Sequence, residues 1–214
     1  MTPPSNLRRR SFLQNAAALG LTQIVPAATF ASPAATPPQG RVVAATEGEH
    51  LIHFRDRGNI FLMRKEYDRA LADFSKSIEL DPKYPSPLIA RSRTWMARKE
   101  YGKALADYKK AVELAPKDAT GSFYYAGLAL FLAGCPEAKF RNGKKALEAA
   151  EKAYQLAKGP GEMSALAAAH AELGQFDKAI EWQTKAAASA PAEVQNGYRN
   201  RLKEYQEQKP YRFQ

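Results

Sequence analysis

The sequence predicts an all-α protein, a right-handed superhelical stack of helix-turn-helix repeats that ends in a capping helix. Residues 65–82, KEYDRALADFSKSIELDP, match residues 99–116, KEYGKALADYKKAVELAP, at 11 of 18 positions. The two copies lie 34 residues apart, a spacing typical of helical hairpins that stack on copies of themselves. Apolar residues recur at helical intervals from Leu51 onward. A proline closes each copy, because proline cannot continue a helix.

The first 31 residues are predicted to be an export signal. Three arginines, Arg8–Arg10, precede a mildly apolar stretch that ends among small residues, which is typical of a signal peptide that is later removed. Polar residues interrupt the apolar stretch, so it is too short to span a membrane. The residues RRSFL at positions 9–13 resemble the twin-arginine export motif. General secretion is the alternative route, and cleavage after Ala31 or Ala34 fits equally well.

We therefore expect the protein to be exported and to act in the periplasm or outside the cell. Residues 32–50 are predicted to be a linker. Without residues 1–31 the formal net charge falls from +10 to +7, a moderate excess that favours acidic surfaces on a partner. The expected partner is a protein or peptide of acidic character; neither nucleic acid nor a stable membrane span is expected.

Two repeat units follow, residues 51–84 and 85–118. In each unit small residues occupy the positions where two helices approach closely, and large rings lie between them, so that the helices can interdigitate. The small residues are Gly58, Ala70 and Ser77 in the first unit, and Ser92, Ala104 and Ala111 in the second. The rings are Phe61, Tyr67 and Phe74, then Trp95, Tyr101 and Tyr108. Each unit is thus predicted to be one helical hairpin.

A third unit spans residues 119–159 and a fourth spans residues 160–193. The third is seven residues longer than the 34-residue period. Its extra residues fall in the turn GCPEAKFRNG, residues 134–143, whose glycines and proline favour a loop. Because added loop length costs little entropy, this segment is either a tolerated surface insertion or a loop that contacts a partner.

The end of the chain, residues 194–214, is predicted to close the stack. A terminal repeat exposes an apolar face that needs a cover, and Val194–Glu207 has the pattern of a further helix. The basic tail that follows it is expected to be loosely ordered or docked through Tyr211 and Phe213.

The repeats resemble the tetratricopeptide repeat (TPR) family, which places small, aromatic and proline residues at these intervals. The stretch ALAAAHAELGQFDKAIEWQTKAAASAP of the fourth unit fits the same frame. In addition, LAGCPEAKFRNGKKA and KPYR resemble a subgroup of exported bacterial TPR proteins with a CP-[DE] turn and a C-terminal PYR ending. The resemblance implies a stacked helical fold and protein binding, and it brings no assigned reaction.

The same resemblance implies where a partner binds, because the first helix of each stacked TPR unit lines a concave groove. Carried over to this chain, the groove residues are Arg55, Asn59, Leu62 and Met63 of the first unit, Ile89, Arg93 and Met96 of the second, and Phe123, Leu130 and Phe131 of the third. This lining is cationic in the first two units and apolar in the third, which suits an extended peptide or a helix with an acidic group and apolar side chains. The alternative is that these side chains only pack the stack.

No enzymatic activity, cofactor or metal is expected. Three histidines and one cysteine are too few for a structural zinc site, and the sequence has no glycine-rich phosphate loop. A thiol enzyme that uses Cys135 with His170 is an unfavoured alternative, since a cysteine nucleophile needs a nearby base and an orienting group. We expect a non-enzymatic scaffold or adaptor. The other alternative is an accessory subunit of a secreted enzyme complex, which it would contact through residues 134–143.

Overall fold

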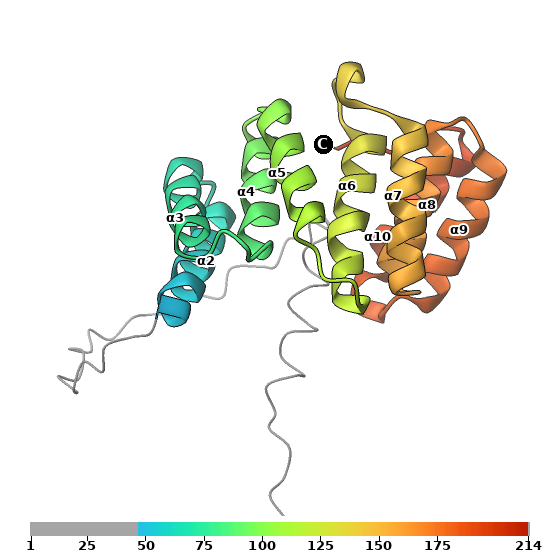
Figure 1. Cartoon of the computed structure of the whole chain (residues 1–214). Helices are drawn as coiled ribbons and strands as arrows, with labels where there is room; N and C mark the ends of the chain where they lie inside the picture. The colour runs from blue at the N-terminus through green and yellow to red at the C-terminus, as the bar shows by residue number, and fades with distance from the viewer. Residues whose placement is uncertain (1–46, 214) are drawn as a thin grey trace, which may run out of the picture. The chain divides into compact units, whose positions relative to one another are not determined.

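The computed structural model describes residues 47–213, and every regular element in this range is a helix (Figure 1). The α-helices are α2 (Glu47–Met63), α3 (Tyr67–Leu80), α4 (Ser86–Ala97), α5 (Tyr101–Glu113), α6 (Ser122–Gly134), α7 (Gly143–Leu156), α8 (Pro160–Glu172), α9 (Phe176–Ser189) and α10 (Ala192–Gln206). Two 3-10 helices, η2 (Ala119–Gly121) and η3 (Ala138–Phe140), belong to the third unit. The predicted all-α class is confirmed. The predicted export signal, residues 1–31, lies outside the described residues.

Consecutive helices form four hairpins: α2 with α3, α4 with α5, α6 with α7, and α8 with α9. The second helix of each hairpin packs on the first helix of the next one, and α10 packs on α9 at the end of the series (Figure 1). Each hairpin therefore buries its apolar face on its neighbours, as stacked repeats require. None of the helices in residues 47–213 has the length and apolar character needed to cross a membrane.

Two helices begin earlier than the sequence suggested. α2 starts at Glu47, inside the segment predicted to be a linker, because no proline stops the helix from extending one turn beyond the buried residue Leu51. α10 starts at Ala192, inside the predicted fourth unit. Pro191 precedes it at the N-cap position with a non-helical ψ of 147°, so the helix begins at the next residue.

The turns within three of the hairpins share one backbone conformation. Lys65, Lys99 and Gly174 adopt left-handed φ angles of 60°, 61° and 74°. The amide that follows each of them donates to a carbonyl five residues earlier: Glu66 to Phe61 at 2.9 Å, Glu100 to Trp95 at 2.8 Å and Gln175 to His170 at 2.9 Å. This hydrogen bond defines a Schellman motif. The repeat period therefore extends to the backbone of the turns.

α10 ends in the same way as the first helix of a repeat. Gln208 has a φ of 54°, and the amide of Lys209 donates to the carbonyl of Glu204 at 2.8 Å. The chain then departs from the pattern, because residues 209–213 form no second helix. α10 thus resembles the first helix of a fifth unit, and the described residues after it follow another course.

The predicted packing of small residues against rings is confirmed in the first unit. A Cβ atom added to Gly58 would lie 2.7 Å from Cε1 of Phe74, which is closer than two carbon atoms can approach. Phe74 is fully buried and packs in a cluster with Ala70 and Ala90. The first helix therefore approaches the second closely because Gly58 has no side chain.

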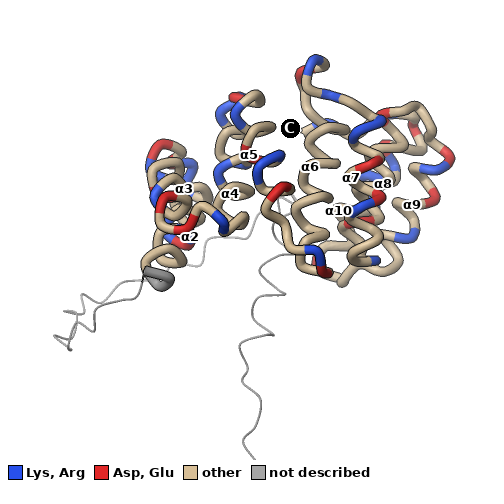
Figure 2. The backbone as a smooth tube through the Cα atoms, in the orientation of Figure 1, with Lys and Arg blue, Asp and Glu red and all other residues tan. Residues whose placement is uncertain are grey.

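The stack is least continuous between the second and third units. α6 packs along both α7 and α8, whereas α4 and α6 hardly touch. α6 has no charged residue, in contrast to α5 and α7 on either side of it in sequence (Figure 2). Such an apolar helix needs cover on several sides. Part of that cover comes from the C-terminal tail, where the ring of Phe213 lies 6.4 Å from that of Phe131.

Candidate functional site: an arginine and tyrosine surface on the first helices

Arg93, on α4, is the most unusual charged residue of the first helices. Its side chain is partly buried, and burial lowers the pKa of the Arg93 guanidinium, with a smaller opposing effect from Tyr108. No carboxylate within residues 47–213 forms an ion pair with Arg93. A desolvated cation without a counter-charge is unfavourable by itself, so an anion bound at Arg93 would be stabilised.

Arg55, on α2, lies in a second polar cluster. Its Nη1 atom donates to the hydroxyl of Tyr84 at 2.7 Å, and its Nε and Nη2 atoms donate to Oδ1 of Asp56 at 2.9 and 2.7 Å. Tyr124, on α6, belongs to this cluster: burial and the neighbouring Tyr84 raise the pKa of Tyr124 to about 12, while Arg55 opposes them. The hydroxyl of Tyr124 therefore stays protonated and can donate a hydrogen bond at neutral pH.

We call these two clusters together the arginine surface: Arg55, Tyr84 and Tyr124 in one cluster, and Arg93, Met96 and Tyr108 in the other. The second cluster is joined by the hydroxyl of Tyr108, which lies 3.5 Å from the sulfur of Met96. Burial raises the pKa of Tyr108, Arg93 lowers it, and Tyr211 of the C-terminal tail raises it slightly. The ring of Tyr108 also packs on that of Phe131, which contacts Phe213 of the tail, so the arginine surface and the tail are linked through Phe131.

The structure divides the ten predicted groove residues into two groups. The accessible or partly accessible ones are Arg55, Asn59, Met63, Arg93, Met96 and Phe123. Ile89, Leu130 and Phe131 are buried, and Leu62 is partly buried where it packs against the Phe74 cluster. The three buried side chains belong to the core, because residues outside their own helices cover them. That the accessible residues line a partner-binding groove stays a prediction.

Phe131 shows the physical reason. It is fully buried, and its ring lies 5.4 Å from the ring of Tyr108 on α5 and 6.4 Å from that of Phe213. The apolar part of the predicted groove is therefore already filled by the second unit and by the chain's own C-terminal tail. What remains accessible is mainly the cationic part.

Sequence reasoning missed three residues of the arginine surface and one residue of the tail. Tyr84 lies in the loop between α3 and α4, and Tyr108 lies on a second helix, so a rule that assigns the surface to first helices leaves both out. Tyr124 of α6 and Arg212 of the tail were also absent from the predicted set. A useful signal for the tail was the run of aromatic and basic residues KPYRF at positions 209–213, since such a run rarely remains solvent-exposed over its whole length.

The loop of residues 134–143 is fixed to the stack. Arg141 donates to the carbonyls of Cys135 and Pro136 at 2.9 and 3.0 Å and to Glu172 at 3.0 Å. The ring of Phe140 lies 6.3 Å from that of Tyr101 on α5. The two largest side chains of the insertion thus serve its own attachment, which supports the interpretation of a tolerated insertion more than that of a partner-contacting loop.

The Cys135 thiol is not arranged as a nucleophile. Cys135 is buried, and burial is the main cause that raises the pKa of its thiol, so the unreactive protonated form is favoured. His170 is also buried, and its Nδ1 atom lies 2.8 Å from Oε1 of Gln175. These environments oppose the thiol-enzyme alternative.

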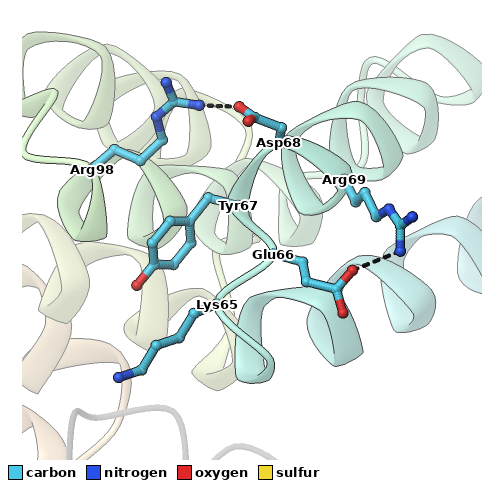
Figure 3. A pocket seen from close by; sticks show the side chains of 6 residues that line it. All are labelled: Lys65, Glu66, Tyr67, Asp68, Arg69 and Arg98. Carbon is cyan, nitrogen blue, oxygen red and sulfur yellow. Dashed lines mark hydrogen bonds and ion pairs between the residues drawn. The ribbon is translucent and has the colours of Figure 1, made fainter.

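A charged depression lies beside the turn between α2 and α3 (Figure 3). Its lining residues are Lys65, Glu66, Tyr67, Asp68, Arg69 and Arg98. Arg98 pairs with Asp68, and Arg69 pairs with Glu66 at 2.7 Å. Its arginines thus already have counter-charges, unlike Arg93, and we do not take this depression as the candidate site.

The fold and the repeat spacing define a class, the helical-repeat stacks, and comparison with known families specifies the repeat. Models of the tetratricopeptide repeat match residues 54–84, 93–118 and 164–193. The chain therefore contains TPR repeats, and TPR proteins are generally non-enzymatic interaction scaffolds that bind protein or peptide partners. None of the matched stretches includes the Cys135–Glu137 turn or the Pro210–Arg212 ending. Comparison with curated protein sequences finds no match.

Solved structures of similar fold agree with this assignment. The crystal structure of YrrB, described as a TPR protein with an unusual peptide-binding site, has a TM-score of 0.51 at 19% identity over 74% of this chain and 82% of YrrB. MamA from Desulfovibrio magneticus RS-1 gives 0.52 at 20% identity, over 76% of this chain and 93% of that one. The APC/C hetero-tetramer Cut9–Hcn1 gives 0.55 at 18%, over 75% and 32%. At these identities the likeness shows the fold alone.

Proposed function

We propose that this chain is a non-enzymatic scaffold that acts outside the cytoplasm and binds an extended, acidic segment of a partner protein on the arginine surface. The observation that carries the proposal is Arg93, a partly buried guanidinium without a carboxylate partner in residues 47–213. A partner carboxylate would supply the missing charge. A hydrogen bond that involves a charged group contributes about 1.5–3 kcal/mol.

The rest of the arginine surface suits an extended peptide. The protonated hydroxyl of Tyr124 adds a donor for a backbone carbonyl, while Met96, beside Tyr108, and Phe123, beside Tyr124, add apolar contacts. All of these side chains, with the loop residue Tyr84, are held by packed helices or by hydrogen bonds that exist before a partner arrives. Little ordering entropy then opposes binding.

The proposal is tested with three synthetic octapeptides that share leucine and phenylalanine at alternate positions and carry glutamate, glutamine or lysine at the others. We expect the glutamate peptide to bind most tightly in fluorescence anisotropy, and its affinity to fall as salt screens the charges. Arg93→Glu should weaken that binding about 10- to 100-fold, which corresponds to the loss of one charge-assisted hydrogen bond.

Lys152→Glu is the matched control, because it makes the same change of charge at an exposed position of the second helix α7. It should leave the affinity within about twofold, since a surface charge away from the site contributes little. Circular dichroism checks that both variants keep their helicity. Equal binding of the glutamate and lysine peptides, or an Arg93→Glu variant that binds like its parent, would refute the proposed site.

Action outside the cytoplasm is supported by the sequence of residues 1–31 and is tested separately. Arg9→Lys combined with Arg10→Lys should leave the full-length precursor inside the cell, because the twin-arginine route requires the arginine pair. Cell fractionation and immunoblotting measure the distribution of the two forms. Export of this variant would show that the protein leaves the cytoplasm by general secretion. If neither the parent precursor nor the variant precursor is ever processed, the proposal that the protein is exported is contradicted.

A further inference from the structure

The C-terminal tail packs against the end of α6, at a place that we call the tail site. The amide of Phe213 donates to the carbonyl of Gly134 at 3.0 Å. Nη1 of Arg212 donates to the carbonyl of Ala133 at 3.0 Å and lies 2.7 Å from Oε2 of Glu172. The two hydrogen bonds to α6 each join residues 79 positions apart in the sequence.

The tail site recognises each tail residue by a different kind of contact. The ring of Tyr211 packs on Gly134, where an added Cβ would lie 2.7 Å from the ring, and the guanidinium carbon of Arg201 lies 3.9 Å from the centre of that ring. The ring of Phe213 faces Phe131. Arg212, which lies between these two aromatic residues in the sequence, contacts the C-terminus of α6. The helix dipole is negative there, and the last carbonyls have no partners within the helix.

α10 has anchors on α8 and α9 in addition to its contacts with the tail, in which Tyr211 packs against the Tyr205 cluster and beneath Arg201. Gln183 of α9 donates to the carbonyl of Tyr198 at 2.9 Å, and Arg201 donates to Ser164 of α8 at 2.8 Å. Tyr205, near the end of α10, is fully buried in a cluster with alanines of α8 and α9. The two hydrogen bonds of α10 do not involve the segment after Gln208 and would remain if that segment left its site.

The contacts that hold the tail are partly accessible to solvent. Its backbone makes one hydrogen bond to α6, and the side chains of Tyr211, Arg212 and Phe213 all remain partly exposed. Departure would leave the carbonyls of Ala133 and Gly134, the carboxylate of Glu172 and the ring of Phe131 without these partners. A peptide with a backbone amide and the side-chain order aromatic, arginine, aromatic could restore these contacts.

We propose that the tail site is a second peptide-binding site, distinct from the arginine surface, which takes a segment of the form aromatic–arginine–aromatic from a partner in exchange for Tyr211–Phe213. The chain's own tail is then an intramolecular ligand that keeps the site closed until such a partner competes. The tail site is linked to the arginine surface through Phe131 but uses none of its arginines. Its ligand is cationic, whereas the ligand proposed for the arginine surface is acidic.

The test uses the full mature chain with Tyr211→Ala and Phe213→Ala, which weakens the intramolecular ligand, and a fluorescent peptide of sequence Lys-Pro-Tyr-Arg-Phe-Gln. We expect the variant to bind this peptide at least tenfold more tightly than the parent chain, whose site is occupied. A peptide with alanine in place of both rings should not bind. Circular dichroism and urea unfolding establish that the variant is folded.

Arg212→Ala provides a second, milder release of the tail if the double variant fails to fold, because it leaves both rings in place. It should also bind the peptide more tightly than the parent chain does. Size-exclusion chromatography tests whether the ligand can be the tail of a second copy. Exchange of tails between two copies would appear as a dimer of the parent chain that the double variant does not form. This result would also support the proposal, because the tail site would then bind a segment from another molecule. A folded variant that binds no peptide, or equal binding by parent and variant, would show that the tail is only a structural cap.

Arg93→Glu separates the two proposals. It should leave binding of the Lys-Pro-Tyr-Arg-Phe-Gln peptide unchanged in the double variant while it weakens the acidic octapeptide. Loss of one activity with retention of the other assigns each peptide to its own surface.

Discussion

Replacing Phe74 by alanine should lower the free energy of unfolding by about 3–5 kcal/mol, the range for a large aromatic side chain removed from a core. Phe74 is fully buried, and its ring fills the space that Gly58 leaves open on α2. Phe61 and Leu62 pack on the same cluster, so the cavity would affect both helices of the first unit. Urea unfolding followed by circular dichroism at 222 nm measures the change.

The loss should also be unevenly distributed along the chain. Repeat stacks are held by contacts between neighbours, so hydrogen exchange in Phe74→Ala should accelerate most in α2 and α3 and least in α8 and α9. Met63→Ala is the control, because Met63 is 83% exposed and its removal should change the stability by less than about 0.5 kcal/mol. A loss below about 1 kcal/mol for Phe74→Ala would mean that the first hairpin is not packed as described.

Replacing Asp107 by alanine should lower the free energy of unfolding by about 2–3 kcal/mol, because it removes two charge-assisted hydrogen bonds and leaves a cation partly desolvated. Nε and Nη2 of Arg91 each lie 2.8 Å from the carboxylate of Asp107. The side chain of Asp107 is only 8% exposed and that of Arg91 is 23% exposed, so water cannot fully replace the lost partner.

The repeat supplies its own comparison. Arg57 and Asp73 form the same two-bonded pair in the first unit, at 2.7 Å for both bonds, but the side chain of Arg57 is 46% exposed. Asp73→Ala should therefore be clearly less destabilising than Asp107→Ala. Parallel urea curves for the two variants decide this, and equal losses would show that solvent exposure of the arginine does not control the energy.

The Arg91–Asp107 ion pair is absent from the fourth unit, and a paired substitution tests how the stack tolerates its absence. Leu166 and Trp182 stand at the corresponding positions of the fourth unit, counted from the turn residue Gly174, and Leu166 is buried. Arg91→Leu in the Asp107→Ala background should recover part of the stability, because it removes the unpaired charge. No recovery would assign the loss to packing and not to charge.

The repeated parts of the fold followed from the sequence because their contacts are local. The duplicated KEY segments, the placement of Gly58 opposite Phe74 and the prolines that separate the hairpins each determine structure within one 34-residue unit or between adjacent units. The turn residues Lys65, Lys99 and Gly174 adopt the same left-handed backbone conformation. The backbone of the turn therefore also recurs from one repeat to another.

The candidate site followed from the sequence only in part. Arg55, Arg93 and Met96 lie on accessible parts of the first helices, as predicted, but Ile89, Leu130 and Phe131 do not. A helical pattern tells which residues share a face, and it does not tell whether another segment covers that face. Three apolar residues of the predicted set are therefore buried, and binding of a partner by the accessible ones stays a prediction.

What the sequence determined by itself is thus the succession of hairpins, their spacing and the cationic character of the first two units, since these depend on residues close together in the chain. Only the tertiary structure decided that Arg93 has no carboxylate partner in residues 47–213 and that Tyr211–Phe213 lie against α6. A contact between residues 79 positions apart depends on how the hairpins stack and on where the last helix ends. A local sequence pattern specifies neither of these.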